Sequence, residues 1–210
     1  MPSQTALQVL QAKVSATPDG VFGPLTANAI RTHYGLSRES CSHLLGQCAH
    51  ESHWFEKSEE NLNYTAKRIQ QCWPHRFATL ADAERCAGNP GALAATVYFG
   101  RMGNDTEEKA TLYTGRGFVQ LTGYDNYRMF SEETARPQIL ANPEIVAHHL
   151  ALDSALWYFQ KRKIFEIAER RGVNDESIEE ISRIVSGGTF GLKERKDATL
   201  KIFGWLNRAS

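Results

Sequence analysis

The 210-residue chain lacks an excess of either charge, because it has 24 Lys and Arg residues and 24 Asp and Glu residues. This balance argues against a large polyanion-binding surface, so we expect no nucleic-acid partner, although a local basic groove stays open. The chain also lacks any apolar run of about eighteen residues, so we expect no membrane insertion. Its first fourteen residues lack a basic stretch followed by an apolar one, which predicts no cleaved signal peptide and synthesis into a cytosol.

Cysteine is scarce, with four residues and no CxxC pair. Cys41 and Cys48 lie two helical turns apart, about 10 Å by helix rise, which is too far for a disulfide. Cys72 and Cys86 could approach each other across a turn, and the sequence leaves their pairing open. Because these spacings match no zinc pattern, we expect free and mostly buried thiols.

Several catalytic signatures are absent as well. The chain has no G-x-S-x-G elbow, and its glycine-rich residues 100–105 lack the lysine of a phosphate cradle. The run His50-Glu51-Ser52-His53 looks superficially like a zinc motif. A zinc-peptidase helix needs its histidines at i and i+4, however, and position 54 is Trp54. We therefore expect neither a metal nor another cofactor.

Helical periodicity dominates what is present. It predicts helices over residues 4–14, 38–51, 65–73, 78–87, 90–99, 178–185 and 189–206, with another beginning near residue 142. Ser37, or alternatively Ser40, is the candidate cap of the second of these helices, and Thr65 is that of the third. Residues 113–127 contain three glycines around the β-favourable residues 118–122, which indicates an extended or irregular segment, or a hairpin with polar edges. We predict a mainly α protein of seven to nine helices with at most a short β element. Residues 1–210 are expected to form a single domain, in which residues 65–100 form a small helical lobe.

The first 35 residues show a weak similarity of their own. An LQ-rich helix is followed by Asp19-Gly20, a turn, and by Gly23-Pro24, which favours a second helix start. The segment resembles the tail of small helical peptidoglycan-binding modules over about 25 residues, less than half a module. The matching residues are Leu7, Gln8, Asp19, Gly20, Phe22, Gly23, Thr26 and Ala29. The alternative is a pair of helices that packs on the main domain.

Glu51 is the first candidate catalytic residue. Helical spacing places it within about 20° of Leu44 around the axis, on the apolar side of its helix. A carboxyl group among apolar side chains resists ionisation, so we expect a raised pKa and a general acid. The alternative is a partly exposed glutamate at the end of a helix.

A second carboxylate is available in the loop that follows, at Glu56, Glu59 or Glu60. Hydrolysis of a glycosidic bond needs two carboxyl groups, one protonated and one ionised. Aromatic rings and hydrogen-bonding side chains alternate through residues 113–127, as a sugar-binding segment would require.

Four ordered runs carry a family resemblance: residues 49–52 (AHES), 59–64 (EENLNY), 100–104 (GRMGN) and 115–123 (GRGFVQLTG). Together they resemble the family 19 glycoside hydrolases. The match is closest to the phage endolysin branch with lysozyme activity, alongside bacterial and plant chitinases, and it spans roughly residues 40–195. The resemblance implies a lysozyme-like, two-lobed helical fold that cleaves β-1,4 bonds between aminosugars with inversion.

The resemblance also implies roles for individual residues. Glu51 matches the general acid, and Glu60 is our choice for the base. Gln120, Thr122 and Asn126 match positions that line the sugar cleft and hold the attacking water. Where the family often has Asn-Gly-Gly, this chain has Ser186-Gly187-Gly188, so that contact would run through water. The full set assigned to substrate binding is Tyr64, Arg116, Gln120, Thr122, Asn126 and Ser186.

From these observations we expect a monomeric endolysin that cleaves bacterial peptidoglycan. It would stay in the host cytoplasm until a separate holin-like protein lets it reach the periplasm and cell wall. The small lobe is a candidate wall-binding module, because basic residues outnumber acidic ones there. A chitinase and a non-catalytic peptidoglycan-binding protein are the alternatives.

Overall fold

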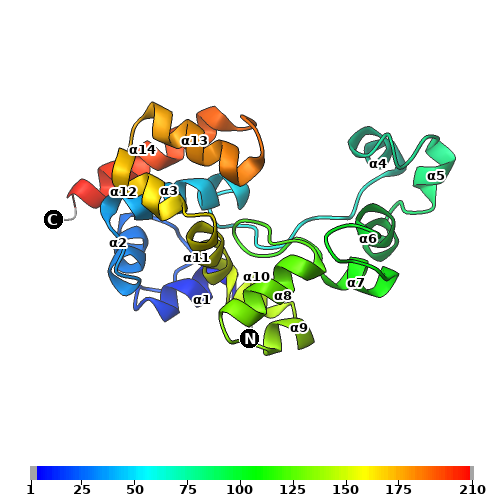
Figure 1. The fold of residues 1–210 in the computed structure, drawn as a ribbon, viewed down its shortest axis with the longest axis horizontal. Coiled ribbons are helices and arrows are strands. Elements are labelled where there is room, and N and C mark those ends of the chain that lie inside the picture. The colour runs from blue at the N-terminus through cyan, green and yellow to red at the C-terminus, as the bar shows by residue number, and fades with distance from the viewer. Residues whose placement is uncertain (1–3, 209–210) are drawn as a thin grey trace. The chain divides into compact units, whose positions relative to one another are not determined.

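The computed structural model describes residues 4–208, and fourteen helices run through them (Figure 1). The chain divides into two units, of which the first comprises residues 1–58, 117–119 and 145–210, and the second residues 59–116 and 120–144. The ends of the predicted ranges 1–35 and 1–210 lie outside the described residues. The predicted mainly α fold is confirmed. No helix in the described part of the chain is long and apolar enough to cross a membrane.

The first unit is built around the packing of α3 (Arg38–Glu51) along α14 (Leu192–Arg208). Gly46 permits their close approach, since the Cβ of any other residue would lie 2.1 Å from Thr199 Oγ1. Leu44, Leu45 and Ile202 are fully buried in this core. The remaining helices of the unit are α1 (Ala6–Lys13), α2 (Pro24–His33), α10 (Ile145–His148), α11 (Ala151–Lys161), α12 (Ile164–Arg171) and α13 (Asp175–Ser186).

Side-chain caps explain where the principal helices begin. The Ser37 hydroxyl accepts a hydrogen bond from the Ser40 backbone N–H, as predicted, and starts α3. Pro24 occupies the first turn of α2, where its missing N–H costs no hydrogen bond. Gly187 adopts a left-handed conformation after α13, the usual way for a helix to end at glycine. Helix α3 begins at Arg38 and ends at Glu51, so the helix predicted over residues 38–51 is confirmed in both bounds.

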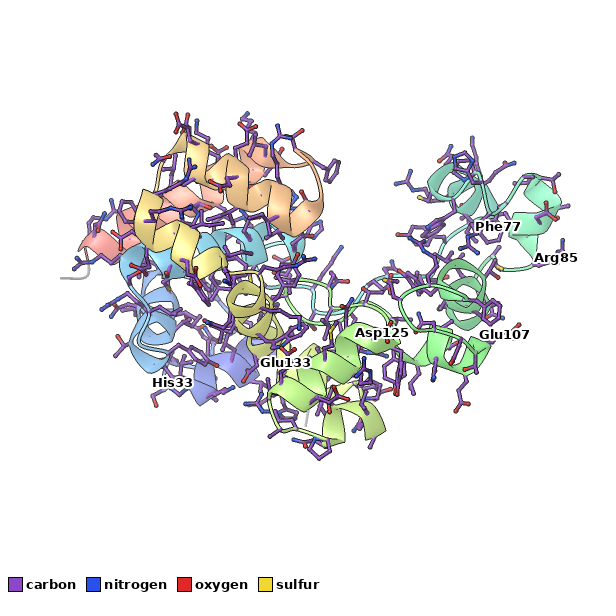
Figure 2. The ribbon with its side chains drawn as sticks, viewed as in Figure 1. His33, Phe77, Arg85, Glu107, Asp125 and Glu133 are labelled. Atoms are coloured by element: carbon purple, nitrogen blue, oxygen red, sulfur yellow. The ribbon has the colours of Figure 1, made fainter. Side chains whose placement is uncertain are left out.

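The second unit has its own small hydrophobic core. Ile69, Phe77, Leu93 and Val97 are almost fully buried within it, and Figure 2 labels Phe77 between α4 and α5. Thr65 caps α4, as predicted. The helices of this unit are α4 (Ala66–Cys72), α5 (Leu80–Glu84), α6 (Pro90–Tyr98), α7 (Glu107–Leu112), α8 (Tyr124–Glu133) and α9 (Gln138–Ala141).

The predicted number of helices was too low, chiefly because several helices are only four to six residues long. Such segments are too short to show a hydrophobic period. Helix α8 was missed for another reason, since it begins at Tyr124 inside a glycine-rich run that the sequence assigned to irregular structure. The segment before α8 contains isolated bridges that pair Arg116 with Glu59 and with Leu121. No strand longer than a single bridge residue occurs among the described residues. All four cysteines are free, and only Cys72 is exposed.

Candidate active site

Glu51 is the last residue of α3, and its side chain is 25% exposed. Its partner is Arg195 of α14, whose Nη2 donates a hydrogen bond to a Glu51 carboxylate oxygen within an ion pair. The carboxyl group therefore does not lie among apolar side chains alone, and that expectation was wrong. The C-terminal end of a helix is an unfavourable place for a negative charge, so the guanidinium also offsets the helix dipole.

Arg195 is itself fixed by buried partners. Only 1% of its surface is exposed, and its Nη1 donates to Gln47 Oε1 at 2.6 Å while its Nε donates to the Phe190 carbonyl at 3.2 Å. Gln47 in turn donates to Ser182 Oγ at 3.0 Å. This buried hydrogen-bonded chain allows the guanidinium little freedom, and it orients the Glu51 carboxylate.

Sequence reasoning missed Arg195, which lies 144 residues from Glu51 along the chain. A usable signal was Gln47, a polar residue at the buried i−4 position relative to Glu51 on the same helix face. A buried amide needs hydrogen-bonding partners, so Gln47 predicts some polar group opposite this end of α3.

The two histidines near Glu51, His50 and His53, lie in different surroundings. His50 packs edge-on against Phe190, with 6.3 Å between ring centroids. Burial holds the pKa of His50 below its ordinary value, and the nearby Arg195 charge adds to this effect. His53 is exposed beyond the end of α3. No group of three or more potential metal ligands occurs among residues 4–208.

In the second unit, Glu60 is fixed by two donors. The Tyr98 hydroxyl donates to Glu60 Oε2 at 2.6 Å, and the Gly115 backbone N–H donates to Oε1. The Glu60 N–H also donates to the Gly115 carbonyl at 3.0 Å. Burial raises the pKa of Tyr98, and the neighbouring Glu60 raises it further, so this hydroxyl remains a donor. Glu59 differs, because it is exposed and forms only a 3.5 Å ion pair with Arg116 Nε.

Three of the predicted residues converge around Gly115. A Cβ at this glycine would lie 2.8 Å from Gln120 Oε1, 3.1 Å from Thr122 Oγ1 and 3.2 Å from Glu60 Oε1. Glycine is thus the residue that lets the three side chains share this space. Asn126 is the next member, since its Nδ2 donates to the Thr122 carbonyl at 2.7 Å. Gln120 has a positive φ of 56°, which makes it a strained position in the turn between the bridges.

Arg116 stabilises the same loop through hydrogen bonds of its side chain. It is 9% exposed, and its Nη1 donates to the Leu112 carbonyl at 2.7 Å and to the Tyr127 hydroxyl at 3.4 Å. Tyr127 then donates to the Thr114 carbonyl at 2.8 Å, and burial raises its pKa to about 12. Arg116 therefore contributes to the shape of the loop as well as to the charge of its surface.

A cleft of about 320 Å³ lies beside Glu60 within the second unit. Its polar lining includes Glu59, Glu60, Asn61, Asn63 and Arg116. A volume of this order is typical of small-ligand sites. Carboxylates, amides and a guanidinium supply both donors and acceptors, which suits the hydroxyl and acetamido groups of an aminosugar.

The other two predicted binding residues have local partners. Tyr64 packs edge-on against Trp73, with centroids 5.7 Å apart, at the margin of the small helical core. In the first unit, the Ser186 hydroxyl donates to the Ser182 carbonyl at 2.8 Å, and Ser186 is exposed.

Comparison with known proteins identifies a relative for most of the chain. This chain is 36% identical over 155 residues to a glycosyl hydrolase family 19 domain-containing protein of Haemophilus influenzae, and the alignment covers 72% of each of the two chains. No family model matches the sequence.

Proposed function

Because this chain belongs to glycoside hydrolase family 19, we propose that it is an endolysin-type muramidase. It would hydrolyse β-1,4 bonds in the glycan of bacterial peptidoglycan and so contribute to lysis of a host cell. The observation that most supports this proposal is that Glu51 and Glu60 are each oriented by dedicated partners, Arg195 for the first and Tyr98 with Gly115 for the second.

In the proposed reaction, Glu51 in its protonated form gives its proton to the departing glycosidic oxygen, and Arg195 stabilises the carboxylate that results. Glu60 removes a proton from the attacking water. The water oxygen bonds to the anomeric carbon on the face opposite the leaving group, so the anomeric configuration inverts. In the structure each Glu60 oxygen accepts one of these two hydrogen bonds and keeps a further lone pair with which to accept the proton of water.

The residues around Gly115 would position the substrate and the water. Gln120 and Thr122 flank the Glu60 carboxylate, and Asn126 braces the turn that presents them. A water held there would lie within hydrogen-bond reach of the base, as general base catalysis requires. Tyr64, Arg116 and Ser186 are proposed as additional substrate contacts.

A chitinase is the alternative within the same family, and a non-catalytic wall-binding protein is the alternative outside enzymes. Mass spectrometry of peptidoglycan and of chitin, each incubated with the protein, tests all three, because it identifies both the bond cut and the sugar at the new reducing end. Fragments ending in N-acetylmuramic acid would support the muramidase. Release of chitin oligomers with intact peptidoglycan would indicate a chitinase, and wall binding without new reducing ends would exclude catalysis.

The identity of the base is tested by two single exchanges. Glu60→Gln should severely lower the rate of hydrolysis, whereas Glu59→Gln should have a mild effect, since Glu59 is exposed and Arg116 is its one side-chain partner within residues 4–208. Glu56→Gln should be mild as well. If the Glu59 variant is the inactive one, the base is Glu59 and the assignment of Glu60 fails.

A further inference from the structure

The first unit has a pocket that the proposed reaction does not use. Its volume is about 630 Å³, and it lies between the turn before α2, the turn after α3 and the outer part of α14. Lys201 and Trp205 follow Arg195 on α14 by six and ten residues, about 9 and 15 Å by helix rise. The pocket lining consists of Gly20, Val21, Phe22, Gly23, Pro24, Trp54, Glu56, Lys201 and Trp205.

Three aromatic rings form one wall of this pocket. Phe22 lies 6.3 Å from Trp54 and 6.2 Å from Trp205 between ring centroids, and the two indoles are 6.2 Å apart. Phe22 also stacks at 4.0 Å on the buried Phe55, which anchors the group to the core. Trp54 nevertheless remains 37% exposed. Broad rings in a partly open pocket offer apolar faces to the C–H surface of a sugar.

A single cation lies over this wall. Lys201 Nζ is 4.6 Å from the centroid of Trp54 and 5.2 Å from that of Trp205. Its side chain is exposed, and it forms no ion pair with any carboxylate among the described residues. Glu56 lines the same pocket. The pocket therefore offers an ammonium group to an anion and a carboxylate to hydroxyl or amide N–H groups.

The backbone that presents Trp54 is strained. His53, Trp54 and Phe55 have positive φ values of 50°, 57° and 71°. Side chains other than glycine rarely adopt this conformation, and such strain concentrates at functional sites. The turn is held by Ser52, whose Oγ accepts from the Phe55 N–H at 2.9 Å. Position 54 is thus occupied by a tryptophan that lines the pocket, although glycine would adopt this backbone conformation with less strain.

We propose that this pocket is a second, non-catalytic glycan site that binds an N-acetylated aminosugar carrying a carboxylate. The inference rests on the proposed function for the identity of the glycan, because peptidoglycan supplies N-acetylated sugars whose amide-linked stem peptides carry free carboxylates. The rings bind the sugar face, Lys201 binds the carboxylate, and Glu56 accepts from a hydroxyl or the acetamido N–H. Binding there tethers the enzyme to its polymer.

The test uses the four tryptophans as local probes in the full-length Glu51→Gln protein. Their indole N–H signals are assigned by single substitutions and followed by NMR during titration with soluble muramoyl-peptide fragments. The Trp54 and Trp205 signals should shift, whereas Trp157 should stay in place. Trp157 is a suitable reference because it is 9% exposed and lies under Lys161, at 5.5 Å, outside the pocket.

Matched lysine exchanges test the role of charge. Lys201→Gln should weaken binding of the muramoyl-peptide at the Trp54 signal by about tenfold, a change of about 1.4 kcal/mol. Binding of a neutral N-acetylglucosamine hexamer at the same signal should change far less. Lys161→Gln, the matched control, should leave both titrations as they were.

The outcomes separate this inference from the proposed function. If the wild-type protein cleaves no wall glycan but the Trp54 and Trp205 signals still respond, the proposed function fails and the second site stands. If the protein cleaves peptidoglycan while these two signals stay fixed at saturating fragment, the second site is refuted. Equal behaviour of the two lysine variants would refute the carboxylate contact.

Discussion

Glu51→Gln should abolish hydrolysis and leave the fold intact. The glutamine amide matches the carboxyl group in shape, but it cannot give a proton to the departing oxygen. General acid catalysis typically contributes about 10²–10⁴ in rate. We therefore expect kcat on purified peptidoglycan to fall by at least two orders of magnitude, while the affinity for the wall is retained.

The cost to stability follows from the contacts of Arg195. In the variant, its Nη2 still meets an oxygen, that of the glutamine amide, and its bonds to Gln47 and Phe190 remain. The guanidinium stays charged, so the variant keeps a hydrogen bond to a charged group, a class worth about 1.5–3 kcal/mol, and loses only the attraction between the two ions. The exchange should therefore cost about 1 kcal/mol. For a chain of this size that corresponds to roughly 2–4 °C in Tm.

The assay compares release of reducing ends with far-UV circular dichroism and thermal unfolding for the same protein sample. Glu39→Gln is the matched control, because Glu39 lies in the first turn of the same helix. It should keep near wild-type activity. More than a tenth of wild-type activity in Glu51→Gln, with a native spectrum, would remove Glu51 from the acid role. A collapse of Tm would refute our account of the Arg195 contacts.

Three further predictions concern other parts of the molecule. Tyr98→Phe removes one donor to Glu60 and should lower kcat/KM about tenfold, measured on peptidoglycan with Tm as the control. Burial lowers the pKa of His43 in the folded protein, so the unfolded chain binds more protons at acidic pH. The free energy of unfolding, measured in urea, should therefore fall as the pH drops through about 6.5. His43→Gln should reduce that fall. In the small lobe, Arg85, which Figure 2 labels, already pairs with Asp82. Exchanging three other exposed basic residues there for glutamine should weaken wall binding and its salt dependence, measured by sedimentation with intact walls, and unaltered binding would leave the lobe as scaffold. These residues are Lys67, Arg68 and Arg76.

The sequence predicted the helices that have strong local signals. The α3 bounds followed from the Ser37 cap and the apolar spacing, and α4 followed from Thr65. The start of α6 followed from the break at Gly88-Asn89-Pro90, and the structure shows that Asn89 caps this helix. In each case a side-chain cap and a hydrophobic period lie within a single window of about a dozen residues. The short helices α7 and α9 were missed because neither signal is complete in four to six residues, whereas α5 lies within the predicted range 78–87.

The partners of the two carboxylates could not be predicted in the same way. Arg195 is 144 residues from Glu51, and Tyr98 is 38 residues from Glu60. No local pattern marks a residue whose role depends on a tertiary contact. Sequence motifs suggested Glu51 and Glu60 as candidates, whereas the orientation and the hydrogen-bonding donors of these carboxylates required the fold.

The two candidate catalytic carboxylates lie in different units of the chain. Glu51 belongs to the first unit and Glu60 to the second, although only nine positions separate them. Each carboxylate takes its orienting partners from its own unit, Arg195 in one case and Tyr98 with Gly115 in the other. Each carboxylate is therefore oriented by contacts within its own unit. A mutation that loosens one set of contacts is expected to leave the other set intact.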